Sequence, residues 1–199
     1  HPSLALCLGP CDISVAEMVG AYTAFARKGV RRCPLYVTRI EDSNGELLAE
    51  FQPRVREVIS EQAACKMVTL MRGVIDNGTG RRMRARYGIT APMAGKTGTT
   101  NDNSDGWFVG YTPSLSFGAW VGGEERDIHF ASMAIGQGAN SALPIAAYFL
   151  KKLYADRSLG YSQDEDFDIP AGFDPCGQQE TAGGEEDAGE EAVLDELGN

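Results

Sequence analysis

Hydrophobic side chains recur at every third or fourth position in three segments of the chain, which predicts three amphipathic helices. The first helix begins at Ser14, which forms a capping-box pattern with Glu17, and it ends at Gly29. The second spans about residues 60–76, and the third spans residues 143–155. Each helix has one apolar face, so we expect each to pack against another layer of the fold.

A hairpin is predicted between the first two helices. Residues 35–40 and 46–51 are apolar runs of strand length, and Asn44 and Gly45 lie between them. Asparagine and glycine tolerate the left-handed backbone conformations of a tight turn, so both are expected to adopt them here.

Three further strands are predicted at residues 94–100, 107–111 and 115–121. The connection between the last two is short, so these strands are expected to be antiparallel neighbours. Gly110 and Gly118 would weaken their strands unless something packs closely on them, and the last helix is the expected neighbour. Together these elements predict an α+β fold, in which helices cover an antiparallel sheet.

The acidic residues are unevenly distributed. The net charge is −10, but residues 1–155 are close to neutral, and most of the excess acid follows them. We expect residues 156–176 to form an acidic strap or linker, and residues 177–199 to form a disordered tail. No nucleic-acid partner is expected, because the only basic concentration is interpreted as a solvated helix face or turn. It consists of Arg81, Arg82, Arg84 and Arg86.

The cysteine pattern predicts no metal site. There are five cysteines without a C-x-x-C pair and only two histidines, so zinc is not expected, and neither is a cofactor. An odd cysteine count, taken alone, suits a reducing compartment. Cys7 and Cys11 either form a disulfide or flank a turn.

The strand at 94–100 carries the candidate chemistry. Side chains alternate along a strand, so Lys96 and Gly98 share one face, and Thr97 and Thr99 share the other. The two hydroxyls could bind a carboxylate, the lysine adds a compact positive charge, and Gly98 allows close approach of a ligand. If the strand is an edge, its free N–H groups could also face a developing oxyanion.

Two other interpretations of this strand exist. A phosphate-binding loop requires glycine at the position of Thr90 and a helix after Lys96, and the sequence fulfils neither requirement. An exposed lysine on an ordinary strand explains most isolated K-T-G triplets. The surrounding sequence therefore decides between this explanation and a functional one.

That surrounding sequence resembles the serine penicillin-recognising transpeptidases, and among them the bifunctional class A penicillin-binding proteins. K-T-G on a strand is the third motif of this superfamily. The resemblance covers most of residues 1–155, which it identifies as the C-terminal portion of a transpeptidase domain. Its segments are residues 2–6, the helix from Ser14, residues 74–80, 96–100, 105–113 and 143–145.

The first two motifs of the superfamily are missing. No serine from Ser3 to Ser162 is followed by lysine three residues later or by asparagine two residues later, so neither S-x-x-K nor S-x-N is present. We expect this chain to be the C-terminal part of a longer protein. It is expected to begin inside the catalytic domain, after the second motif, and to be inactive alone. A degenerate pseudoenzyme is the alternative.

The resemblance implies acyl transfer to peptidoglycan stem peptides that end in D-Ala-D-Ala, by a serine outside this chain, with β-lactams as mimics. It implies that Lys96 assists proton movement and offers charge to the substrate carboxylate. It also implies that Thr97 and Thr99 bind that carboxylate beside Gly98, and that the Thr99 N–H is half of the oxyanion hole.

The resemblance further implies a place outside the cytoplasmic membrane, on the periplasmic side. A glycosyltransferase domain and a transmembrane anchor are expected in the N-terminal part that this chain lacks. Two other functions stay open: a carboxypeptidase or β-lactamase-like hydrolase, and a non-catalytic binding module. The match around Thr79 and Trp107 favours the transpeptidase.

Overall fold

The computed structural model describes residues 4, 9 and 11–177. Cys7, and with it the possible disulfide to Cys11, lies outside the described residues, as does the predicted tail beyond Gly177.

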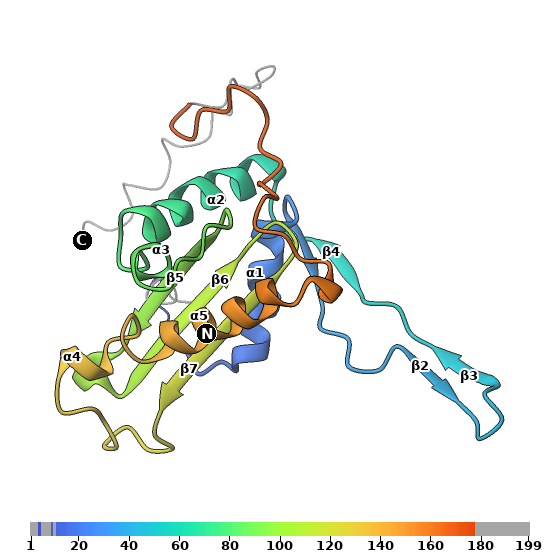
Figure 1. The fold of residues 1–199 in the computed structure, drawn as a ribbon, viewed down its shortest axis with the longest axis horizontal. Helices are drawn as coiled ribbons and strands as arrows, with labels where there is room; N and C mark the ends of the chain where they lie inside the picture. Colours follow the sequence, from blue (N-terminus) through green and yellow to red (C-terminus); the bar gives the residue numbers. More distant parts are fainter. Residues whose placement is uncertain (1–3, 5–8, 10, 178–199) are drawn as a thin grey trace, which may run out of the picture.

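The centre of the fold is a three-stranded antiparallel sheet in the order β5-β6-β7 (Figure 1). Its strands are β5 (Ala94–Thr99), β6 (Asp105–Tyr111) and β7 (Ser116–Gly122). The three predicted strands and the antiparallel pairing of the last two are confirmed.

Helices cover the sheet on both faces, as Figure 1 shows. The helix α5 (Ala142–Ala155) lies on one face, against β6 and β7. On the other face, α1 (Val15–Ala26) contacts the same two strands, and α2 (Glu61–Asp76) runs along β5. The predicted α+β class is therefore confirmed, with the sheet between helical layers.

The helices begin where their capping residues predict. The Ser14 hydroxyl accepts a hydrogen bond from the Glu17 N–H at 3.2 Å, and the Glu17 carboxylate accepts one from the Ser14 N–H at 3.0 Å. This reciprocal pair is the predicted capping box. At α2, the Ser60 hydroxyl accepts from the Ala63 N–H at 3.2 Å.

Two hydrophobic clusters form the core, one on each side of the sheet. The first contains Phe108 and Phe117 of the sheet together with the buried face of α5. The second contains Tyr111, which packs edge-on to Tyr22 of α1 at a ring-centroid distance of 6.1 Å. Burial against α1 and α2 raises the pKa of the Tyr111 phenol far above its ordinary value, so this ring remains neutral.

One packing prediction was wrong. We expected α5 to pack on both glycines of the sheet, but Gly118 faces α1 instead. A Cβ atom at Gly118 would lie 2.7 Å from Cγ2 of Val19. A Cβ atom at Gly110 would lie 2.9 Å from Cζ of Phe117, a ring of the sheet itself. Glycine at 118 therefore allows α1 to dock closely on β7.

Residues 30–57 form an arm that extends away from the sheet (Figure 1). At its base, β1 (Val30–Arg32) pairs with β4 (Val55–Glu57), and these two short strands were not predicted. At its tip, β2 (Arg39–Glu41) pairs with β3 (Leu47–Glu50), which confirms the hairpin.

The hairpin differs from its prediction in two details. Residues 35–38, which were predicted to belong to the first strand of the hairpin, are not part of a strand. Among the turn residues only Gly45 is left-handed, with φ of 84°, whereas Asn44 is not. The Asp42 carboxylate instead orders the turn, because it accepts from the N–H groups of Asn44 and Glu46 at 2.8 and 2.9 Å.

The remaining elements are short. They are α3 (Arg82–Ala85), the 3₁₀ turns η2 (Asn101–Asn103) and η3 (Arg157–Leu159), and α4 (Met133–Gly136). Within the described residues, no helix combines the length and apolar character needed to cross a membrane.

The chain after α5 returns over the second cluster. The ring centroids of Phe167 and Tyr111 are 5.7 Å apart, and Asp166 forms an ion pair with Arg72 of α2 at 3.0 Å. Asp168 accepts from Lys28, which also pairs with Glu61, and these two carboxylates raise the pKa of the lysine. The division at residues 155 and 176 stays a prediction.

Candidate functional site

The strand β5 carries the predicted site residues at an edge of the sheet, because it has only β6 as a partner in the described part of the chain. Directly opposed residues of an antiparallel pair share a face, and Thr97 lies opposite Phe108 of the first cluster. The strand alternation therefore places Thr97 and Thr99 on the α5 face, and Lys96 and Gly98 on the other. Thr97 is buried, whereas Lys96 and Thr99 are exposed.

The Thr97 hydroxyl has a partner from the end of α2. Its oxygen lies 2.7 Å from the hydroxyl oxygen of Thr79, and either group can donate. Because Thr79 follows the turn that ends α2, this bond ties that turn to the middle of β5. One of the two hydroxyl protons remains available to another acceptor.

The Thr99 hydroxyl contacts the loop between α4 and α5. It accepts a hydrogen bond from the Gly138 N–H at 3.1 Å. Gly138 lies so close to the sheet that a Cβ atom there would overlap the carbonyl oxygens of Gly98 and Trp107. The loop at Gly138 therefore borders the strand, and the proton of the Thr99 hydroxyl remains free to donate.

The outer edge of β5 presents backbone N–H groups. The Thr100 N–H donates to the carbonyl of Asp105 across the hairpin at 3.1 Å. Backbone groups alternate in direction along a strand, so the N–H groups of Thr97 and Thr99 point away from β6. The carbonyl of Thr97 lies on the same outer edge, and it accepts a hydrogen bond from the Lys96 ammonium at 2.7 Å.

A polar network fixes the turn after β5. The Asp105 carboxylate accepts from the indole N–H of Trp120 at 2.8 Å and from the Thr100 hydroxyl at 2.9 Å. Asp102 and Asn103, in the same turn, have positive φ values of 56° and 59°. The network closes the β5–β6 hairpin immediately beyond Thr99, and a triplet motif such as K-T-G gives no sign of it.

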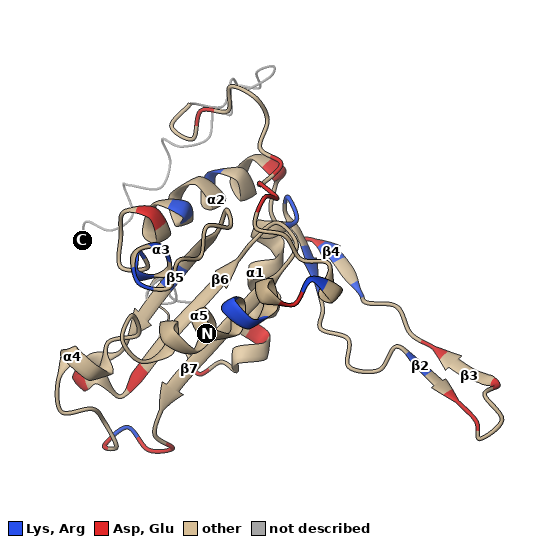
Figure 2. Cartoon of the chain, viewed as in Figure 1, with Lys and Arg blue, Asp and Glu red and all other residues tan. Residues whose placement is uncertain are grey.

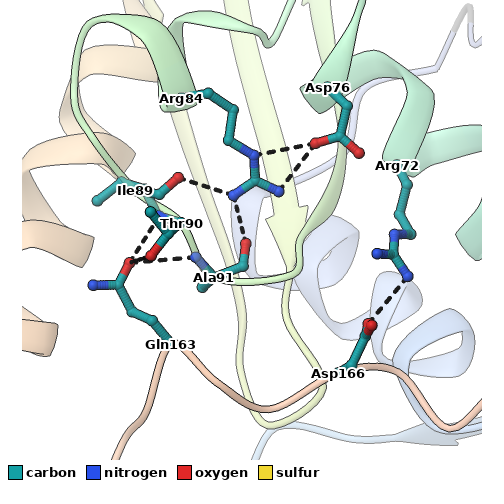
Figure 3. Close-up of polar contacts among 8 residues, drawn as sticks. All are labelled: Arg72, Asp76, Arg84, Ile89, Thr90, Ala91, Gln163 and Asp166. Carbon is teal, nitrogen blue, oxygen red and sulfur yellow. Dashed lines mark hydrogen bonds and ion pairs between the residues drawn. The ribbon is translucent and has the colours of Figure 1, made fainter.

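The four arginines of the cluster do not share one environment. Arg84 is structural: it pairs with Asp76 at 3.1 Å and donates to the carbonyls of Ile89 and Ala91 at 2.9 and 2.6 Å (Figure 3). Its interpretation as part of a solvated face was therefore wrong. The Gln163 side-chain oxygen accepts from the N–H of Thr90 at 2.9 Å, as Figure 3 also shows. These bonds hold the segment that leads into β5.

The other two arginines of the segment 81–84 face a hollow beside the two threonines. This hollow, called the basic hollow below, has a volume of about 230 Å³. It is lined by Gly78, Thr79, Arg81, Arg82, Gln137 and Ala139. The Arg82 guanidinium reaches across to the carbonyl of Ala139 at 3.4 Å. The arrangement therefore combines hydroxyl protons, outward N–H groups and two guanidinium groups, all of which suit an anionic ligand.

The fold and the open strand edge agree with the expected transpeptidase domain, and sequence comparison specifies the family. Residues 3–123 match the family described as penicillin binding protein transpeptidase domain. The match covers more than half of the chain, and the chain therefore belongs to that family. The resemblance stated above, including its class A branch, is confirmed.

Among curated relatives, Penicillin-binding protein 1A of Aquifex aeolicus is 34% identical over 172 residues, which is 85% of this chain and 22% of that protein. Penicillin-binding protein 2D of Bacillus subtilis is 37% identical over 128 residues, 61% of this chain and 18% of that protein. The chain thus spans about a fifth of the length of these relatives.

Among solved structures, the penicillin-binding protein PonA1 of Mycobacterium tuberculosis superposes with a TM-score of 0.66 at 28% identity, over 85% of this chain and 44% of that one. Penicillin-Binding Protein 1A of Haemophilus influenzae gives 0.71 at 21% identity, over 84% of this chain and 29% of that one, and this shows the fold alone. The individual roles of Lys96, Thr97, Gly98 and Thr99 stay predictions.

Proposed function

We propose that this chain supplies the carboxylate-binding strand of a peptidoglycan D,D-transpeptidase, whose serine nucleophile lies in a part of the protein outside this sequence. The observation that carries the proposal is the edge of β5. There, the hydroxyls of Thr97 and Thr99 share a face, and their N–H groups point outward. Membership of the transpeptidase family supports this substrate class.

In the proposed reaction, the serine oxygen attacks the carbonyl carbon of the penultimate D-alanine of a stem peptide. The serine proton passes, with help from Lys96, to the leaving amine, and the terminal D-alanine departs. An amine from a neighbouring peptide then attacks the acyl-enzyme ester. The crosslink forms, and the serine regains its proton. β-Lactams acylate the same serine, but their opened ring remains attached.

The carboxylate end of the substrate lies, in this proposal, against the hydroxyls of Thr97 and Thr99. The hydrogen bond from Gly138 to the Thr99 oxygen supports this assignment, because it directs the free hydroxyl proton elsewhere. Gly98 keeps the strand open to close approach. The outward N–H of Thr99 donates to the oxyanion, and losing one such donor typically costs about a hundred- to a thousandfold in rate.

The wider setting is also part of the proposal. We place the protein in the bacterial cell envelope, on the periplasmic side of the inner membrane, with a glycosyltransferase domain and a membrane anchor in its N-terminal part. Its relatives named Penicillin-binding protein 1A and 1B support this setting.

The proposal is tested by acylation of the full-length protein with a fluorescent penicillin. Lys96→Ala should suppress both labelling and crosslinking without changing the circular dichroism spectrum, because the exposed lysine contributes little to packing. Lys96→Arg should restore little activity, since its planar guanidinium is larger than an ammonium group. Thr99→Ala should have a milder effect, because the backbone N–H survives.

Lys151→Ala, which removes an exposed lysine from α5, serves as the matched control and should label normally. The isolated chain of 199 residues should take no covalent label, and intact-mass spectrometry should find no adduct. Labelling of Lys96→Ala at the unaltered rate would refute the catalytic assignment. A stoichiometric adduct on the isolated chain would refute the placement of the nucleophile outside this sequence.

A further inference from the structure

The basic hollow is lined by two arginines that have no acidic partner among the described residues. Arg72 and Arg84 pair with Asp166 and Asp76, whereas neither Arg81 nor Arg82 forms an ion pair within the described residues. Figure 2 shows this basic segment at α3, beside β5. Two like charges that face one space repel each other, and an anion bound between them would relieve that repulsion.

The hollow lies next to the partners of both threonines of the candidate site, although neither Thr97 nor Thr99 lines it. Thr79 lines it and is bonded to the Thr97 hydroxyl at 2.7 Å. On the opposite wall, Gln137 and Ala139 flank Gly138, whose N–H donates to the Thr99 hydroxyl at 3.1 Å. An anion held by the two hydroxyls would therefore lie at the edge of this hollow.

The lysine of the strand is less well placed to neutralise that anion. Lys96 leaves β5 on the face opposite to the hydroxyls, and its ammonium is bonded to the carbonyl of Thr97 at 2.7 Å. The guanidinium of Arg82 already extends to the carbonyl of Ala139, across the hollow on the hydroxyl side. A guanidinium also matches a carboxylate better than an ammonium does, because it can donate two parallel hydrogen bonds.

We propose that Arg81 and Arg82 bind the terminal carboxylate of the peptide substrate, and the equivalent carboxylate of a β-lactam, as its ion-pair partners. The carboxylate lies between the two guanidinium groups and the hydroxyls of Thr97 and Thr99. Lys96 is thereby left to proton transfer at the serine. This assignment rests on the proposed transpeptidase function and names the groups that select an anionic substrate at that site.

The test compares four acylation rates, in which the positive charges of the arginines and the negative charge of the ligand carboxylate are removed separately and together. The full-length protein and its Arg81→Gln/Arg82→Gln variant are each acylated with benzylpenicillin and with benzylpenicillin methyl ester, which lacks the anionic carboxylate. The double substitution should slow acylation by the free acid about ten- to a hundredfold, as expected for losing hydrogen bonds to a charged group. The rate with the ester should be unchanged.

Two further variants separate charge from geometry. Arg82→Lys keeps the charge but loses the bidentate fork, so its rate with the free acid should fall between those of the unaltered protein and the double variant. Arg86→Gln removes a neighbouring exposed charge that stacks on Tyr87 and does not line the hollow, so it should leave both rates unchanged. Thermal melting of every variant checks that the fold is intact.

Equal slowing of the acid and the ester would overturn the inference, because the arginines would then act on the strand and not on the carboxylate. Undiminished acylation of the double variant by the free acid would also overturn it. If the unaltered protein reacts with neither ligand, the proposed function itself fails, and this inference fails with it.

Discussion

The central sheet and the arm both contain antiparallel strands with hydrophobic side chains. These side chains are buried in the sheet but exposed in the arm. Phe108 of β6 is 0% exposed and belongs to the first cluster, together with the buried face of α5, whereas Leu48 of β3 is 65% exposed. Both strands pair correctly with an antiparallel neighbour. The difference is that helices cover both faces of the central sheet, and no described residue covers the tip of the arm.

This difference shows which part of the fold holds the candidate site in place. β5 is fixed on one side by β6 and along its length by α2, and the bonds from Thr79 and Gly138 restrain its hydroxyls. The arm has backbone pairing but little burial of its own side chains. Stability should therefore depend strongly on the sheet and weakly on the arm.

The sharpest test of this contrast compares two truncations to alanine. Phe108→Ala should lower the free energy of unfolding by about 3–5 kcal/mol, because it leaves a cavity between the sheet and α5. Leu48→Ala should change the free energy by less than about 0.5 kcal/mol, since the side chain is already largely in water. Urea unfolding of both variants measures this, and similar losses at the two positions would contradict the contrast.

A smaller effect is expected from a methyl group added at the site loop. Gly138→Ala would push Cβ into the backbone oxygens of Gly98 and Trp107, so we expect a loss of about 1–3 kcal/mol and a loop displaced from Thr99. Gly73→Ala is the control, because Gly73 lies in α2 with no atom within 4 Å of a Cβ there. That variant should gain up to about 1 kcal/mol from helix propensity.

Urea unfolding gives the two free energies, and the amide signal of residue 138 in a two-dimensional NMR spectrum reports the loop. A stable Gly138→Ala variant with an unshifted neighbourhood would show that the loop does not pack on β5 as described.

The smallest effect concerns pH and the start of α1. The hydrogen bond from the Ser14 hydroxyl, followed by that from the Ser14 N–H, holds the pKa of the Glu17 carboxyl below its ordinary value. A depressed acid pKa stabilises the fold above the pKa of the unfolded chain, and the contribution is lost as pH falls through the folded pKa. The protection factors of the amides in the first turn of α1, which compare each exchange rate with the intrinsic rate at the same pH, should therefore fall in that acid range.

Glu17→Gln should remove this pH dependence, since glutamine does not titrate there. Protection factors that are unchanged on acidification in the unaltered chain would contradict the role given to the capping box.

Local features of the fold could be predicted because their causes are local. The capping box at Ser14 and the alternation that places Thr97 and Thr99 on one face depend on residues a few positions apart. The hairpin of the arm was predicted as well, although its strands are shorter than the apolar runs.

Contacts between distant segments could not be predicted in this way. The docking of α1 on Gly118 and the bond from Gly138 to Thr99 join residues from separate elements. The same holds for Arg84, whose role depends on carbonyls brought near it by a turn. A pattern of residue types predicts which face is apolar, but it does not specify which neighbour covers it.

The central claim is that the outer edge of β5 binds the anionic end of the substrate. The most direct measurement is a crystal structure of the full-length protein acylated by benzylpenicillin. We predict that the penicillin carboxylate accepts hydrogen bonds from the hydroxyls of Thr97 and Thr99, and that the acyl oxygen accepts one from the Thr99 N–H. The account would be contradicted by a ligand carboxylate that is bound away from this edge and makes no hydrogen bond to either hydroxyl.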